Sequence, residues 1–176
     1  GGNAFDAMVA TELALAVAYP FAGNLGGGGF MVYRKANGDV GSIDYREKAP
    51  ASAHRDLYLD ETGNVIPGMS TLGATAVGVP GTIAGITEVH AKMGSLPFDE
   101  ILAPVIALAK KGVVVTEKQA KSMASQREII AKISGEQSLF AQHYVAGDTI
   151  KYPALATTLA TIAKGGRKAF YEEEMA

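Results

Sequence analysis

The sequence predicts an α+β fold in which a mixed first part, residues 1–80, precedes a mainly helical part, residues 81–176. Strand patterns around an Asn-Gly dipeptide mark the first part, and apolar residues at helical spacing dominate the second. The chain has 176 residues, of which 48% are hydrophobic and 19% charged, enough to bury a core. Because no linker-like stretch divides it, we expect residues 1–176 to form a single unit.

The first helix is predicted from Asn3 to about Ala18. Asn3 is a favourable N-cap, and Asp6 stands three residues later, where a capping box places an acidic side chain. Pro20 then stops the helix. Its apolar face is formed by Phe5, Met8, Val9, Leu13 and Val17.

A β-hairpin follows the first helix. The predicted strands are Gly29–Arg34 and Val40–Tyr45, and Asn37-Gly38 between them is typical of a two-residue turn. Arg46 stands at the end of the second strand. Residues 50–70 read as an irregular excursion with a turn at 60–64, and residues 74–79 could form another strand.

The second half reads as a series of helices. Pro80-Gly81 starts one that Gly94 closes, and Ser95 caps the next, which should break or kink at Pro104. Residues 117–133 form a more polar helix, followed by turns over residues 134–149. A further helical face ends at Gly165-Gly166, and a last short helix begins at residue 167.

Composition excludes several classes of protein. Sixteen basic and eighteen acidic residues give a net charge of −2, and no basic patch suggests a nucleic-acid partner. The absence of cysteine excludes disulfides and thiolate chemistry. The longest apolar stretch, residues 13–22, is too short to span a membrane. The chain opens with Gly1 rather than Met and ends in a helical pattern, so we expect a piece of a longer protein.

The glycine run Gly26–Gly29 could cradle an anion through its backbone amides. It lacks both nucleotide-binding fingerprints, and it enters a strand, whereas such loops leave a strand and enter a helix. Glycine also permits close approach of a neighbouring backbone. Two interpretations therefore stay open at this point: a structural turn, or a non-enzymatic module that binds an anion or nucleotide.

Arg46 is the candidate binding residue, because an arginine at a strand end can donate two parallel hydrogen bonds to a carboxylate. A surface ion pair would explain the same residue. His54, His90 and His143 lack the spacing of metal ligands, so no metal or cofactor is predicted. No serine stands in a Gly-x-Ser-x-Gly elbow, and no catalytic residue is assigned within the chain.

Six blocks stand out in the sequence: Gly1–Ala7, Asn24–Met31, Asp44–Pro50, Gly78–Gly85, Ala107–Gly112 and Phe170-Tyr171. In this order and spacing they resemble the γ-glutamyltranspeptidase family. Phe5 and Tyr45 stand where valine and phenylalanine are expected in that family.

The resemblance implies a partial αββα sandwich of the N-terminal-nucleophile hydrolase type, within an internal piece of the large subunit. It implies a parent precursor that cuts itself into two subunits. The N-terminal threonine of the small subunit then attacks γ-glutamyl amides such as glutathione and forms an acyl-enzyme. By resemblance, Arg46 pairs with the α-carboxylate of the γ-glutamyl group, and the parent is periplasmic or extracellular. Without the small subunit, we expect this chain to be inactive and prone to self-association.

Overall fold

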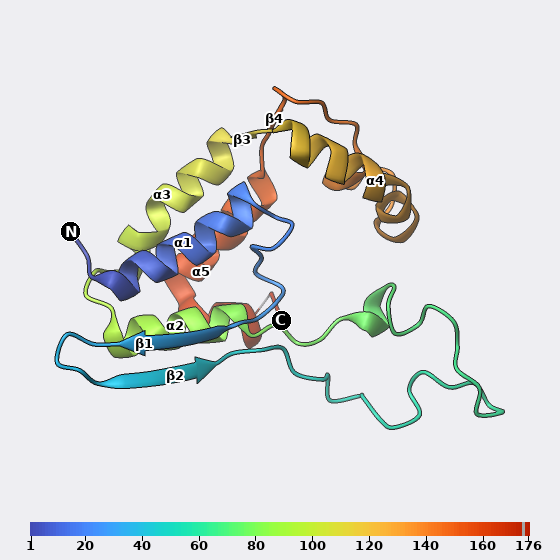
Figure 1. Ribbon diagram of the computed structural model, residues 1–176, viewed down its shortest axis with the longest axis horizontal. Helices are drawn as coiled ribbons and strands as arrows, with labels where there is room; N and C mark the ends of the chain where they lie inside the picture. Colours follow the sequence, from blue (N-terminus) through green and yellow to red (C-terminus); the bar gives the residue numbers. More distant parts are fainter. Residues whose placement is uncertain (174) are drawn as a thin grey trace. The chain divides into compact units, whose positions relative to one another are not determined.

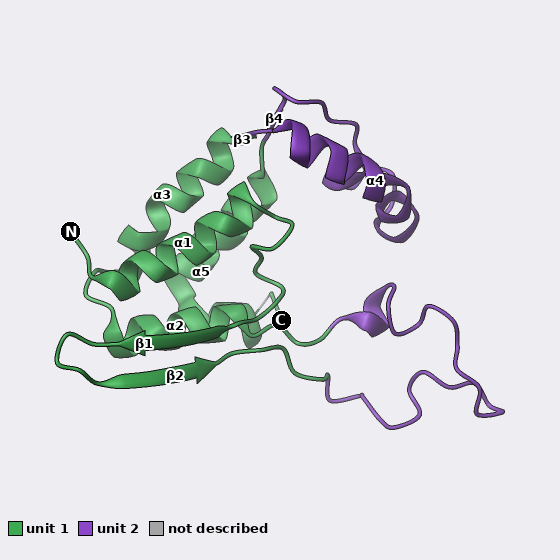
Figure 2. Ribbon diagram, viewed as in Figure 1, with its two compact units in different colours: residues 1–49, 78–113, 151–176 green, residues 50–77, 114–150 purple. Residues whose placement is uncertain are grey.

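The computed structural model describes residues 1–173 and 175–176 (Figure 1). They divide into two compact units, the first formed by residues 1–49, 78–113 and 151–176, the second by residues 50–77 and 114–150 (Figure 2). The helices are α1 (Ala4–Ala18), α2 (Thr82–Met93), α3 (Phe98–Lys111), α4 (Glu117–Ser134) and α5 (Pro153–Tyr171). The strands are β1 (Phe30–Arg34), β2 (Val40–Asp44), β3 (Val113–Val114) and β4 (Thr149–Ile150).

Helix α1 begins as its sequence predicts. The Asn3 side chain accepts hydrogen bonds from the backbone amides of Phe5 and Asp6, and the Asp6 carboxylate accepts one from the Asn3 amide at 2.8 Å. The capping box is therefore confirmed, and the helix ends at Ala18 as expected. Asp6 is only 3% exposed, which is unusual for a capping residue.

Strands β1 and β2 form the expected antiparallel hairpin, with Phe30 opposite Asp44 and Arg34 opposite Val40. The predicted two-residue turn is wrong. The Lys35 amide donates to the Asp39 carbonyl at 2.8 Å and the Gly38 amide to the Lys35 carbonyl at 3.0 Å, so the loop has an additional residue. Among the loop residues 35–39, all of which the structure describes, only Gly38 has a positive φ, 94°, as in a type I turn followed by a glycine bulge.

The core of the first unit lies among α1, α2, α3 and α5, with α2 beside the hairpin (Figure 1). Tyr33 of β1 places its ring 5.7 Å from that of Phe5, so one face of the hairpin packs toward α1 as predicted. The largest fully buried apolar side chains come from four helices: Val9, Leu13, Val17, Ile83, Ile86, Val89, Leu102, Leu159 and Ile162. Their helical spacing matches the predicted faces and confirms a helix-rich α+β fold.

Two predictions around α2 and α3 are wrong. Residues 74–79 do not form a strand: Ala74–Ala76 is a single 3₁₀ turn, η1, and Val79 only makes an isolated bridge with Lys48. Ser95 does not cap α3, whose N-cap is Pro97. Instead, the Ser95 hydroxyl donates to the Asp6 carboxylate at 2.5 Å and its amide at 2.9 Å, because this loop satisfies the buried carboxylate.

Pro104 in α3 and Gly166 in α5 have different effects on the helices that contain them. Helix α3 continues through Pro104, so of the predicted break or kink the break does not occur. Pro104 lies on the exposed side of the helix, where water can satisfy the carbonyl that its missing N–H leaves unpaired. Helix α5, in contrast, has non-helical angles at Gly166 (φ 56°, ψ −141°), which confirms the predicted interruption there.

The second unit has few buried side chains. Asp60 organises the predicted turn at residues 60–64 by accepting from Thr62 and Asn64. Thr116 caps α4, which packs on the 3₁₀ turn η2 (Leu139–Ala141). Val115 exchanges backbone hydrogen bonds with Asp148 and Gly147. Within the described residues of the chain, no helix is both long and apolar enough to cross a membrane.

Candidate functional site

Arg46 follows β2 directly, at the strand end where the sequence places it, and its guanidinium is held in two directions. Asp44 accepts from Nη2 at 2.8 Å and from Nε at 3.2 Å, and its carboxylate also accepts from the Arg46 amide at 3.1 Å. The Phe30 ring centre lies 4.8 Å from Cζ of Arg46, within cation–π range. The guanidinium therefore has a carboxylate at one edge and an aromatic ring over one face.

The ion pair affects both charged groups. The hydrogen bonds from the Arg46 side chain, followed by that from its backbone amide, lower the pKa of Asp44 below its usual value. The hydrogen bond to Asp44 likewise raises the pKa of Arg46. Both groups are thus charged at neutral pH, and Arg46 is a permanent cation at the end of the strand.

Tyr45 anchors the segment that carries Arg46. Its side chain is 7% exposed, and its hydroxyl lies 3.5 Å from a Glu12 carboxylate oxygen. Burial, together with the Glu12 charge, raises the pKa of Tyr45 to about 12. Because Tyr45 points into the core, the neighbouring side chains Asp44 and Arg46 both point to the opposite face of the hairpin.

Three glycines leave room for this segment. A Cβ on Gly28 would lie 2.5 Å from the Tyr45 carbonyl oxygen and 2.7 Å from Cα of Arg46. A Cβ on Gly81 would overlap the same carbonyl, and one on Gly85 would overlap the Tyr45 ring. These glycines let the glycine run and α2 approach the backbone of Tyr45 and Arg46 closely.

The glycine run itself contacts the start of α2. The Gly27 carbonyl accepts from the amides of Gly81 at 2.7 Å and Thr82 at 3.0 Å, and the Ala84 amide donates to the Tyr171 hydroxyl at 3.2 Å. Amide donors that could hold an anion at this helix terminus are therefore engaged within the protein. The glycine run thus makes structural contacts through its carbonyl groups, while the alternative of an anion- or nucleotide-binding module stays a prediction.

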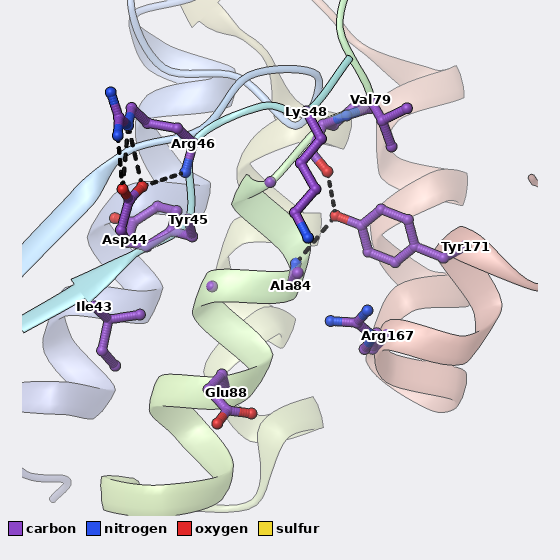
Figure 3. Close-up of a pocket in the computed structure, with 13 residues that line it drawn as sticks. Ile43, Asp44, Tyr45, Arg46, Lys48, Val79, Ala84, Glu88, Arg167 and Tyr171 are labelled. Carbon is purple, nitrogen blue, oxygen red and sulfur yellow. Dashed lines mark hydrogen bonds and ion pairs between the residues drawn. The ribbon is translucent and has the colours of Figure 1, made fainter. Parts of the chain in front are cut away.

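A cavity of about 320 Å³ lies beside this segment, between the end of β2, α2 and α5. Figure 3 shows Arg46 turned toward Asp44 on the strand side, with Arg167 and Tyr171 of α5 across α2. The Tyr171 hydroxyl donates to the Pro80 carbonyl at 2.7 Å, which joins α5 to the start of α2. The Arg167 guanidinium lies 5.2 Å from the centre of the Tyr171 ring.

Comparison with known proteins decides the family. The family model described as gamma-glutamyltranspeptidase matches residues 1–176. The chain belongs to the γ-glutamyltranspeptidase family. The resemblance of its sequence blocks to that family is confirmed, and the closely packed glycines and Arg46 lie within those blocks.

Curated members of the γ-glutamyltranspeptidase family align with nearly the whole chain. It is 44% identical over 174 residues to the "Glutathione hydrolase proenzyme" of Pseudomonas aeruginosa, covering 98% of this chain and 30% of that protein. It is 39% identical over 180 residues to the protein of the same name from Escherichia coli, covering 100% of this chain and 31% of that protein. The chain thus spans about a third of the curated relatives' length.

Solved γ-glutamyltranspeptidase structures share the fold. The crystal structure of the Helicobacter pylori enzyme matches with a TM-score of 0.95 and 42% identity, over 100% of this chain and 52% of that one. The Pseudomonas nitroreducens γ-glutamyltranspeptidase complexed with L-DON matches with a TM-score of 0.90 and 42% identity, over 99% and 51%. The predicted fold class, part of an N-terminal-nucleophile hydrolase, is confirmed.

His90 makes a local contact within the first unit of this member of the γ-glutamyltranspeptidase family. His90 bonds through Nε2 to the Leu96 carbonyl oxygen at 2.8 Å and packs on Phe98. Across the part of the chain that the structure describes, no group of three or more His, Cys, Asp or Glu side chains could hold a metal ion.

Sequence reasoning missed Asp44 and Phe30 as neighbours of Arg46. Asp44 was detectable, because residues two apart in an extended strand lie on the same face. Phe30 required the register of the hairpin, which depends on the length of the turn.

Proposed function

We propose that this chain is the donor-binding part of an enzyme that transfers or hydrolyses γ-glutamyl groups, with glutathione-type donors as substrates. The match of the γ-glutamyltranspeptidase family to all 176 residues carries this proposal. The name "Glutathione hydrolase proenzyme" borne by relatives up to 44% identical supports the substrate class and a processed precursor. In this scheme a threonine in a second, small subunit is the nucleophile, and it forms the acyl-enzyme that water or an amino acid resolves.

Arg46 binds the α-carboxylate of the γ-glutamyl donor in this proposal. A carboxylate offers two oxygens in a plane, and a guanidinium offers parallel N–H groups that match them. The observation that supports this role is the position of Arg46 at a strand end, held by Asp44 at 2.8 Å and beside a cavity. A rigidly held cation can select donors that carry the α-carboxylate and orient their amide toward the nucleophile.

The test compares two donors in the intact parent enzyme. One is a γ-glutamyl anilide, and the other is the 4-aminobutanoyl anilide, which lacks only the α-carboxylate. Arg46→Ala should lower kcat/KM for the first donor by roughly thirty- to a thousand-fold and change the second much less. Arg46→Lys should not restore activity, because an ammonium cannot donate two parallel hydrogen bonds to a carboxylate as a guanidinium does. Equal losses with both donors would show that Arg46 is structural.

The remaining parts of the scheme concern the parent protein. The chain alone should show no γ-glutamyl transfer, because in this scheme the nucleophile belongs to the small subunit. Turnover of a γ-glutamyl anilide by the purified chain above a heat-inactivated control would contradict this. We further propose a periplasmic or extracellular parent, which fractionation of the source cells would test.

A further inference from the structure

We propose that Asp44 and Phe30 are positioning residues for the donor: together they hold the Arg46 guanidinium so that its Nη1–Nη2 end meets the α-carboxylate. This inference rests on the proposed function of Arg46. It assigns two further residues to donor selection and specifies which edge of the guanidinium the donor uses.

The edge follows from the hydrogen bonds of Asp44. A guanidinium carries N–H donors on Nε, Nη1 and Nη2 in a fixed plane. Asp44 accepts from Nε at 3.2 and 3.3 Å and from Nη2 at 2.8 Å. These hydrogen bonds occupy the edge of the guanidinium that is formed by Nε and Nη2. The Nη1 group and the second hydrogen of Nη2 point away from Asp44. A carboxylate that approaches this end can accept two parallel hydrogen bonds without displacing Asp44.

Phe30 restricts the remaining freedom of the side chain. It lies directly opposite Asp44 in the β1–β2 register, and its ring centre is 4.8 Å from Cζ of Arg46. Asp44 therefore fixes rotation within the guanidinium plane, while Phe30 covers one of its faces. Phe30 and Asp44 pair across the two strands, and Arg46 follows Asp44 by two positions. The hairpin therefore holds the Arg46 guanidinium in place before any donor binds.

The size of the effect follows from exposure. The Arg46 and Asp44 side chains are 61% and 55% exposed, so their ion pair contributes little to the stability of the fold. Its contribution is to orientation, because a free arginine side chain samples many rotamers that the donor would otherwise have to restrict. Removing Asp44 should therefore raise KM for a carboxylate-bearing donor by about three- to tenfold.

Asp44 has a second, opposing effect, since its negative charge repels the incoming carboxylate. If repulsion outweighed orientation, the neutral variant would bind the donor more tightly. The two effects have opposite signs in KM, so one measurement distinguishes them.

The experiment uses the intact parent enzyme and the two anilide donors described above. Asp44→Asn and Phe30→Leu should each raise KM for the γ-glutamyl donor, leave kcat within about twofold, and leave the 4-aminobutanoyl donor unchanged. In an Arg46→Ala background, Asp44→Asn should have no further effect on either donor, because it acts through Arg46. Asp99→Asn is the matched control: it removes the same charge from the exposed first turn of α3.

The outcomes test separately the positioning role of Asp44 and the donor-binding role of Arg46. An unchanged or lower KM for Asp44→Asn, or equal changes with both donors, would overturn the positioning role while Arg46→Ala still discriminates between the donors. If Arg46→Ala itself affects both donors equally, the proposed function of Arg46 fails first. The melting temperature of each variant, compared with that of wild type, shows in either case whether the variant is folded.

Discussion

Tyr171→Phe tests how the end of α5 stabilises the start of α2. The change removes one oxygen atom and keeps the ring. That oxygen donates to the Pro80 carbonyl at 2.7 Å and accepts from the Ala84 amide at 3.2 Å. Because α5 is interrupted at Gly166, its last turn depends on such local contacts for its position.

The expected loss follows from two neutral hydrogen bonds. Each contributes about 0.5–1.5 kcal/mol net, and a partner left unpaired in a partly buried position costs about as much as the lost bond. Water can reach one side of this site and reduce the penalty, since Tyr171 is only half-buried. We therefore expect Tyr171→Phe to lower the free energy of unfolding by about 1–2 kcal/mol.

Urea denaturation of wild type and variant measures this loss, and hydrogen exchange at the Ala84 amide locates it. The Ala84 amide should exchange faster in Tyr171→Phe. The matched control is Tyr19→Phe, because Tyr19 is 44% exposed and its ring contacts Phe21. That control should change the free energy of unfolding by less than about 0.5 kcal/mol. Equal stability of the two variants together with unchanged Ala84 exchange would refute the reasoning.

Three further predictions concern other parts of the first unit. The hydrogen bond from the Ser95 hydroxyl, aided by backbone amides, holds the pKa of Asp6 well below its usual range. The charged form therefore stabilises the fold above the ordinary pKa of about 4, and this contribution is lost as the pH falls below it. Thermal melting between about pH 5 and pH 2 should show a flatter acid dependence for Asp6→Asn than for wild type, and an identical slope would contradict this assignment. Gly81→Ala, whose Cβ would overlap a backbone oxygen that follows β2, should lower the melting temperature, whereas Gly26→Ala, with open space around its Cβ, should not. Val32 is 83% exposed on the apolar outer face of the hairpin, so Val32→Lys should reduce self-association of the purified chain in light scattering. A wild-type chain that is cleanly monomeric at high concentration would count against that last expectation.

The helices of this chain are predictable because local signals and burial agree. Asn3 with Asp6 caps α1 in sequence and in structure, and Gly166 interrupts α5 where the glycine pair predicts an end. The exception is Pro104, which lies within α3 on its exposed side. A sequence pattern shows that proline lacks a donor, but it does not show whether the unpaired carbonyl will face water.

Contacts between distant segments explain the other differences. Ser95 precedes a helical pattern and reads as a cap, yet its hydroxyl donates to Asp6, 89 positions away. Residues 74–79 contain β-branched side chains, but only Val79 finds a strand-like partner, in Lys48. In both cases the local preference is real and a tertiary partner decides the outcome, which spacing alone does not reveal.

The register of the hairpin determines the neighbours of Arg46, and one residue in the turn determines the register. A two-residue turn at Asn37-Gly38 would pair Tyr45 with Phe30 and leave Asp44 opposite Met31. The observed loop, with Gly38 at φ 94°, shifts the pairing by one position and places Phe30 opposite Asp44. In antiparallel strands such a shift changes which side chains share a face, so Phe30, Asp44 and Arg46 would not meet in the shorter turn. A single left-handed glycine eight residues before Arg46 thus supplies the aromatic partner of the proposed donor-binding arginine. Deleting Ala36 shortens the loop to Asn37-Gly38 but keeps Lys35 opposite Asp39, and therefore Phe30 opposite Asp44. This variant should leave KM for the γ-glutamyl donor within about twofold in the intact enzyme. A large rise would show that the loop itself, rather than the register, positions Arg46.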